Sequence, residues 1–123
     1  MKLTNNQIYS YAIQLNEAFT DATQRIPMKI NFYLQKNKTT LMEMAQDIEN
    51  NRMDIIKNYG VVVEDDPDKY SIPADKIQEA QQELVDLLNL EQEVNIYMIS
   101  VDSLTDDISL TTAQMEAIMF MIE

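Results

Sequence analysis

The chain of 123 residues contains no cysteine and no histidine, and these two absences exclude most familiar kinds of catalytic site. Without cysteine there is neither a disulfide nor a thiolate nucleophile. Without histidine there is no imidazole base, which excludes Ser-His-Asp and Cys-His arrangements and ordinary zinc sites. Any catalysis would depend on carboxylates, lysine, tyrosine or a metal held by oxygen atoms. We therefore expect a protein that is not an enzyme and that uses no cofactor.

Glycine and long apolar runs are also scarce. Gly60 is the only glycine, so the glycine-rich phosphate loops of nucleotide-binding proteins are excluded. No apolar run reaches the roughly 18 residues that a transmembrane helix requires. The first residues are polar and lack the apolar stretch of a secretory signal. With the absence of cysteine, these features favour a reducing, cytoplasmic compartment.

Positive charge is scarce in the second half of the chain only. Residues 1–60 carry seven Lys or Arg and six Asp or Glu, whereas residues 61–123 carry two and fifteen. The net charge of −12 is therefore +1 in the first half and −13 in the second. An acidic surface repels nucleic acid and anionic membranes and attracts basic surfaces. We expect a protein partner with a basic surface, and neither direct nucleic-acid binding nor membrane binding.

Hydrophobic periodicity predicts a single, mainly α domain over residues 1–123, with a long helix, three shorter helices and a small antiparallel β element. The helices are expected at about residues 5–20, 28–59, 74–91 and 112–122. The β element is expected as a hairpin of residues 61–63 and 70–72. A further strand is expected at 94–101, where apolar residues alternate.

Local signals mark the ends of the helices. Thr4 with Gln7, and Thr111 with Gln114, have the spacing of a capping box. Gly60 directly follows the long helix, where a left-handed residue is common. At 1.5 Å per residue this helix would be roughly 45–50 Å long. We therefore expect part of it to project, or to pair lengthwise with another helix.

The first predicted partner-binding cluster is an acidic stripe on the helix expected at 74–91. It consists of Asp75, Glu79, Glu83 and Asp86. Their spacing puts the carboxylates on one helix face, with about 5–6 Å of rise between neighbours. That rise is close to the phosphate spacing of a nucleic-acid strand, which makes nucleic-acid mimicry one hypothesis for the stripe. The other interpretation is a solvated outer face, since surface helices are usually charged.

The second predicted cluster is an acidic loop. It consists of Glu64, Asp65, Asp66 and Asp68. The loop lacks the central glycine and the closing glutamate of an EF-hand, so we expect no metal site. A solvated turn and a contact point for a basic partner are the two interpretations.

A basic run and a methionine-rich C-terminus complete the candidates. The basic run consists of Arg25, Lys29, Lys36 and Lys38. We expect it to balance the acidic half, within one subunit or between subunits, because four cations are sparse for a phosphate or membrane site. The apolar candidates are Met115, Met119, Phe120 and Met121. Methionine suits both core filling and adaptable interfaces, so both interpretations stay open, including a homo-oligomer interface.

Five stretches of the chain stand out together and in order: MKLTNNQIY (1–9), INFYLQKN (30–37), KNYG (57–60), YSIP (70–73) and LTTAQMEAI (110–118). With these stretches the chain resembles an uncharacterised family of small proteins from phages and prophages of Gram-positive bacteria. The resemblance implies expression in the cytoplasm of a bacterial host, and it supplies no catalytic residues. It implies a protein that inhibits a host protein, such as an antiviral defence complex. The alternative is a minor structural or assembly component of the phage particle that oligomerises through its helices.

Overall fold

The structure is a computed structural model that describes residues 1–21, 24–63, 66–105 and 108–123, with side chains described throughout except at residues 62–68. In these ranges the chain is mainly helical, as the periodicity predicts. The helices are α1 (Asn5–Ala18), α2 (Met28–Tyr59), α3 (Ile77–Asn89) and α4 (Thr112–Ile118). The strands are β1 (Lys2–Thr4), β2 (Val61–Val63), β3 (Asp66–Ser71) and β4 (Glu91–Glu93). Short 3-10 helices cover Val101–Ser103 and Met119–Met121.

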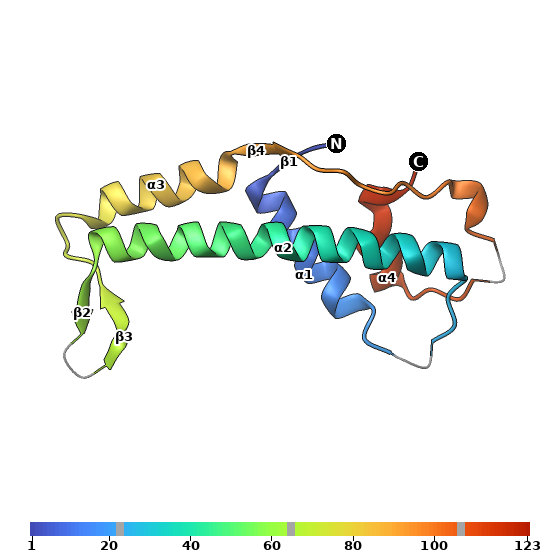
Figure 1. Cartoon of the computed structure of the whole chain (residues 1–123), viewed down its shortest axis with the longest axis horizontal. Helices are drawn as coiled ribbons and strands as arrows, with labels where there is room; N and C mark the ends of the chain where they lie inside the picture. The colour runs from blue at the N-terminus through green and yellow to red at the C-terminus, as the bar shows by residue number, and fades with distance from the viewer. Residues whose placement is uncertain (22–23, 64–65, 106–107) are drawn as a thin grey trace.

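The long helix α2 is the axis of the molecule (Figure 1). α1 crosses α2 near its middle, and α4 packs on α1. α3 runs antiparallel to the C-terminal half of α2, which confirms that part of the long helix pairs lengthwise with another helix. The β2–β3 hairpin lies beside the C-terminal end of α2 (Figure 1). We call residues 49–59 of α2, the hairpin and α3 the arm, and the remainder the body.

The hydrophobic core lies in the body. Ile8 of α1, Leu41 of α2 and Ile118 of α4 are inaccessible to solvent, and they belong to the apolar stripes of their helices. In α3, by contrast, Ala80 is the one fully buried residue. The arm is therefore mainly a pair of helices, and the described residues leave much of its outer surface open to solvent.

Two small antiparallel sheets join distant parts of the chain. β2 pairs with β3, which confirms the predicted hairpin, although β3 begins at Asp66 and not at Tyr70. β1 pairs with β4, with Leu3 opposite Gln92, and this pairing holds the N-terminal residues beside the end of α3. The β1–β4 sheet was not predicted, because its three-residue strands carry no periodicity and pair across about ninety residues of sequence.

Both predicted capping boxes are present. The Thr4 hydroxyl oxygen accepts from the Gln7 N–H at 3.1 Å, and the Gln7 side-chain oxygen accepts from the Thr4 N–H at 2.9 Å. Thr111 and Gln114 form the same reciprocal pair, with both distances 3.1 Å. These bonds satisfy N–H groups in the first turns of α1 and α4, which have no partner inside the helix.

Gly60 ends α2, but not in the predicted way. Its φ of −93° and ψ of 160° are extended, so the prediction of a left-handed cap is wrong. A Cβ atom at this position would lie 2.7 Å from the carbonyl oxygen of Ile56 and 3.0 Å from Cβ of Tyr70. Glycine is required here chiefly because a Cβ atom would overlap the Ile56 carbonyl of the last turn of α2, and Tyr70 of β3 lies close as well.

Residues 94–101 do not form the predicted strand. β4 ends at Glu93, and within the described residues the segment contributes a single bridge, from Ile99 to Ile122. The Val94 N–H donates to the Met1 carbonyl at 2.8 Å, and the Ile99 N–H donates to the Met121 carbonyl at 2.7 Å. The apolar alternation therefore reflects burial of an irregular segment. The helix predicted at 112–122 also ends early, at Ile118, and continues as a 3-10 turn.

Candidate interaction surfaces

α3 carries three exposed carboxylates, which we call the acidic row: Glu79, Glu83 and Asp86. Their separations of four and three residues keep them on one face of the helix, about 4.5–6 Å apart in rise. Asp75, predicted in the same stripe, is also exposed but lies in the turn before α3. The helix begins at Ile77 and not at residue 74, so the predicted stripe is a helical row of three with one carboxylate before it.

The acidic row is only partly engaged within the chain. Hydrogen bonding to Glu83 raises the pKa of Tyr59 above its usual value, which identifies Glu83 as a link between α3 and α2. Asp86 accepts a hydrogen bond of 2.9 Å from the side chain of Gln82. In the part of the chain that the structure describes, neither the acidic row nor Asp75 forms an ion pair. No Lys or Arg side chain of the described residues is therefore in direct contact with the carboxylates of the acidic row.

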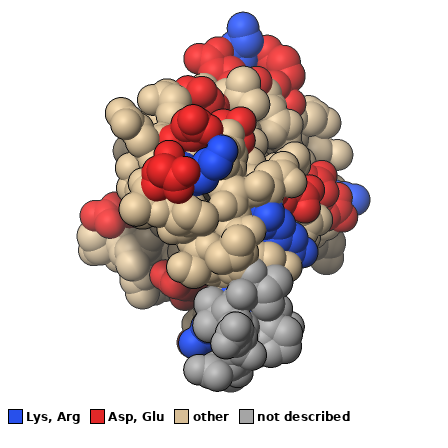
Figure 2. All heavy atoms as spheres, turned by 90° about the vertical axis from the view of Figure 1, so that its left-hand side faces the viewer, with Lys and Arg blue, Asp and Glu red and all other residues tan. Residues whose placement is uncertain are grey.

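Apolar side chains are exposed along the same arm. Val85 and Leu90 are 50% and 58% exposed. A hollow of about 250 Å³, which we call the arm groove, is lined by Ile55, Leu87 and Leu90 and bordered by Glu83 and Asp86. Seen from the end of the arm, acidic side chains stand in separate groups, several of them beside a Lys or Arg side chain, on a largely uncharged surface (Figure 2). An apolar groove with a charged rim is typical of protein-binding surfaces.

The acidic loop is only partly described. Glu64 and Asp65 lie outside the described residues. Asp66 and Asp68 belong to β3, and their side chains are not described. The role predicted for this loop therefore stays a prediction.

A second exposed surface lies near the N-terminal end of α2, about six helical turns from the arm groove. Four of its side chains follow at helical spacing along α2, and the fifth comes from the segment after β4. We call this the aromatic–lysine patch: Lys29, Phe32, Tyr33, Lys36 and Tyr97. Tyr97 packs edge-on against Tyr33 and Phe32, with ring centroids 5.3 and 6.4 Å apart. Lys29 lies 5.8 Å from the ring of Tyr33, and Lys36 lies 5.5 Å from the ring of Phe32.

Asn37 holds the patch in place from below. Its side chain is 0% exposed, donates to the Tyr97 carbonyl at 2.9 Å and accepts from the Tyr97 N–H at 2.8 Å. This pair of bonds fixes the backbone of Tyr97 against α2 much as a strand neighbour would. The patch is therefore preorganised, while Phe32 and Tyr97 remain 51% and 37% exposed.

The structure divides the predicted basic run. Lys29 and Lys36 belong to the patch, whereas Lys38 points to a different face of α2 by helical geometry. Arg25 is exposed in the segment before α2. The sequence therefore identified two of the patch residues by charge but not its aromatic residues. The spacing of Lys29, Phe32, Tyr33 and Lys36 was a signal that could have found the α2 part.

The methionine-rich C-terminus mostly contributes to the core of the chain itself. Met121 is fully buried, and Met115 is half-buried. Phe120 stacks on Tyr11 of α1 with ring centroids 4.2 Å apart. Met119 is 64% exposed. Of the four predicted interface residues, Met119 is therefore the one with most of its surface available to a partner.

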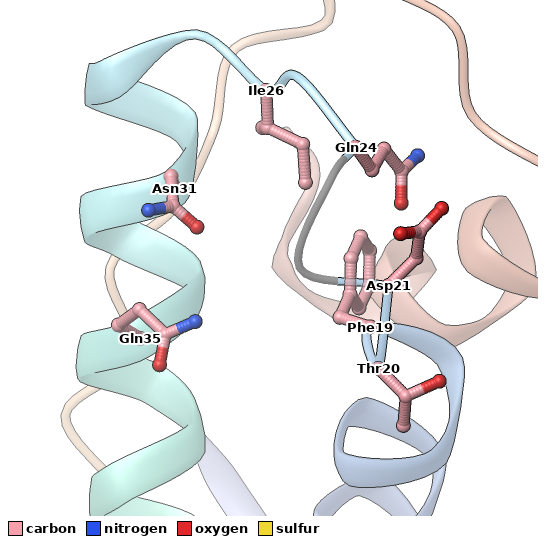
Figure 3. Close-up of a pocket in the computed structure, with 7 residues that line it drawn as sticks. All are labelled: Phe19, Thr20, Asp21, Gln24, Ile26, Asn31 and Gln35. Atoms are coloured by element: carbon pink, nitrogen blue, oxygen red, sulfur yellow. The ribbon is translucent and has the colours of Figure 1, made fainter.

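A polar pocket of about 290 Å³ lies between α2 and the end of α1 (Figure 3). Asn31 and Gln35 project from α2 on one side, and Phe19 and Asp21 lie on the other. Thr20, Gln24 and Ile26 complete the described lining. The lining offers amide groups and a single carboxylate, with no histidine, cysteine or cation among its described residues. These seven described residues include no arrangement of groups that would activate a nucleophile or hold a metal.

The described residues also bear on a possible metal site and a possible membrane span. Among them, no group of three or more carboxylates is placed to hold a metal ion. None of the described helices combines the length and the apolar character needed to cross a membrane. Comparison of the chain with protein-family models, with curated proteins and with solved structures finds no match.

Proposed function

We propose that this protein works by binding a partner protein that presents a basic surface, that it does so through the arm, and that it is not an enzyme. The observation that carries the proposal is the position of the acidic row beside the arm groove. Carboxylates without ion pairs attract and orient a basic partner, and the apolar groove supplies the area that such a partner would bury.

The identity of the partner forms the finer part of the proposal. The resemblance to phage and prophage proteins supports a host protein as the partner, bound in the bacterial cytoplasm and inhibited by the binding. A host protein that normally holds nucleic acid, such as part of an antiviral defence complex, would present a basic surface. The regular rise along the acidic row would suit a groove made for phosphates.

The alternative is a minor structural or assembly component of the phage particle. The specific observation that favours it is the exposure of apolar residues on α3 and directly after it, at Val85 and at Leu90. Exposed apolar side chains on a two-helix arm are suited to helix-mediated oligomerisation. Stoichiometric recovery of the protein in purified particles would favour this role over inhibition.

The proposal is tested by affinity capture from host cells with the unmodified chain and a reversed-charge variant. The variant D75K/E79K/D86K leaves Glu83 in place, because Glu83 is bonded to Tyr59. We expect capture of the partner to fall at least about tenfold in the variant, and to fall with added salt for the unmodified chain.

A matched control separates the effect of the arm from that of net charge. Glu17, Glu43 and Glu116 are exposed carboxylates on α1, α2 and α4. The variant E17K/E43K/E116K makes the same change in net charge away from the arm and should capture the partner as well as the unmodified chain. Equal capture by the unmodified chain and the arm variant at low salt would contradict the proposed role of the arm.

A further inference from the structure

The aromatic–lysine patch is not used by the proposed function, and its composition is that of a protein-binding surface. Aromatic residues anchor interfaces because they bury large areas with few rotatable bonds. Here Phe32 and Tyr97 are exposed, and the bonds from Asn37 hold the backbone of Tyr97 in place before any partner arrives. A preordered surface loses less conformational entropy on binding.

The chemistry of the patch selects an acidic partner with apolar side chains. Lys29 and Lys36 lie at the two ends of the α2 part of the patch, one turn on either side of the rings. A cavity of about 200 Å³ opens beside Tyr33 and Lys29, with Ile99 and Glu123 among its lining residues. A suitable occupant would place carboxylates near the lysines and an apolar side chain in the cavity.

The arm of the same protein has these properties. The acidic row presents three carboxylates over about two helical turns, and Leu90 is an exposed leucine beside it. We propose that the aromatic–lysine patch of one copy docks the acidic row and arm groove of a second copy, in a head-to-tail arrangement. The inference shares the acidic row with the proposed function but does not rest on it.

The two surfaces cannot meet within a single chain. Tyr33 and Ile55 lie on the same continuous helix, and a rise of 1.5 Å per residue places them about 33 Å apart. Because α2 is unbroken between them, the arm cannot fold back onto the patch (Figure 1). Contact between them must therefore join two molecules.

Local charge favours this arrangement over other self-contacts. With a net charge of −12, two copies repel each other at long range. Head-to-tail docking sets Lys29 and Lys36 of one copy against the acidic row of the next, whereas pairing of two arms sets one acidic row against another. A head-to-tail contact repeats, so it closes into a ring or continues as a filament.

Charge-swapped variants test the inference by sedimentation velocity over a range of protein concentrations at low salt. We expect the unmodified chain to associate in a concentration-dependent way that salt weakens. K29E/K36E alone and D75K/E79K/D86K alone should each weaken association at least about tenfold, because each turns attraction at the contact into repulsion. An equimolar mixture of the two should associate again, since a reversed patch then meets a reversed arm.

Two further variants act as controls. K2E/R25E makes the same change in net charge as K29E/K36E at exposed positions outside both the patch and the arm, and should associate like the unmodified chain. F32A removes an exposed ring without changing charge and should weaken association, with circular dichroism confirming the fold of every variant. An unmodified chain that stays monomeric at about millimolar concentration, or a mixture of folded swapped variants that does not associate, would overturn the inference.

The same variants distinguish this inference from the proposed function. K29E/K36E leaves the arm unchanged, so it should still capture a basic partner while it fails to self-associate. If a folded variant loses self-association but still captures the basic partner, the proposed function is unaffected. If a folded variant loses capture of the partner but still self-associates, the proposed head-to-tail contact is unaffected.

Discussion

Three buried amide side chains connect segments that lie far apart in the sequence. They are Asn5, Asn37 and Gln114, and each donates to a main-chain carbonyl at 2.7–2.9 Å. The carbonyl groups belong to Leu87, Tyr97 and Ala18. A hydrogen bond contributes only about 1 kcal/mol net to the free energy of unfolding, but a buried polar group left without its partner costs more. These residues therefore fix loop positions that apolar packing alone would not specify.

Asn37→Ala should destabilise the fold by roughly 2–3 kcal/mol, because it removes the partner of both the N–H and the carbonyl of Tyr97. Asn51→Ala is the matched control: Asn51 is exposed on the same helix and bonds only to its own helix, at the Asp47 carbonyl. That change should stay within about 0.5 kcal/mol. Urea unfolding measures both, and equal effects of the two changes would show that the Asn37 bonds are not important.

At the residue scale the sequence predicts the chemical character of a side chain better than it predicts which residues that side chain contacts. The lysines of the patch were identified by charge. Charge could not reveal Tyr97, which lies sixty residues after Asn37 in the sequence and reaches the patch through an irregular segment. The residues that complete this surface depend on a tertiary contact that leaves no local pattern.

At the scale of elements, α1 and α2 are joined by a polar cluster outside the core. Glu49 of α2 accepts a hydrogen bond from the Tyr9 hydroxyl of α1. Arg52 donates to both carboxylate oxygens of Glu49, at 2.7 and 3.0 Å. Hydrogen bonding from Arg52 and then from Tyr9 lowers the pKa of Glu49 to about 2, whereas burial and the bond to Glu49 raise the pKa of Tyr9 to about 12. The cluster therefore favours ionised Glu49 and neutral Tyr9.

Glu49 should make the stability of the fold depend on acid pH. Its pKa is lower in the folded chain than in the unfolded chain, so its contribution is present above about pH 4.5 and is lost as the pH falls towards 2. Because about a third of the side chain is exposed, solvent screening limits the contribution to roughly 1 kcal/mol. Glu49→Gln should therefore be less stable than the unmodified chain at neutral pH, with a difference that shrinks below pH 4.5.

Chemical denaturation between pH 2 and 7 measures this difference. Glu43→Gln, an exposed carboxylate earlier on α2, is the control and should give a smaller difference from the unmodified chain at neutral pH. A difference for Glu49→Gln that stays constant down to pH 2 would contradict the role of Glu49 as an ionised acceptor.

The elements themselves were predicted where signals are local and long. The bounds of α2 follow from a repeating apolar stripe with Pro27 before it and Gly60 after it, and the structure has these bounds. α1 and α4 begin at capping boxes that the sequence shows directly. β1 and β4 were missed because a three-residue strand is stabilised by its partner and not by its own pattern. The strand predicted at residues 94–101 was wrong because burial of the segment, and not pairing with another strand, produced its apolar alternation.

For the whole molecule, the contrast between body and arm decides where stability lies. Core residues from α1, α2 and α4 form one cluster in the body. In the arm, α3 buries a single residue, Ala80, and packs mainly on α2. Segments with few buried apolar contacts open at lower free energy than the global unfolding transition. The surface proposed for binding thus lies on the arm, which is the less stable part of the molecule. A bound partner would therefore stabilise the arm more than the body.

Native-state hydrogen exchange should resolve this difference in local stability between the arm and the body. Amide groups of α3 should be protected at least about tenfold less than those of α1, because α3 opens locally while α1 exchanges through global unfolding. Protection within α2 should fall from the body towards Tyr59, although the helix is continuous. At concentrations where copies associate, protection of α3 should rise in the unmodified chain and stay low in K29E/K36E. Equal protection of α1 and α3 in the dilute chain would mean that the arm unfolds only with the body, and would contradict its lower stability.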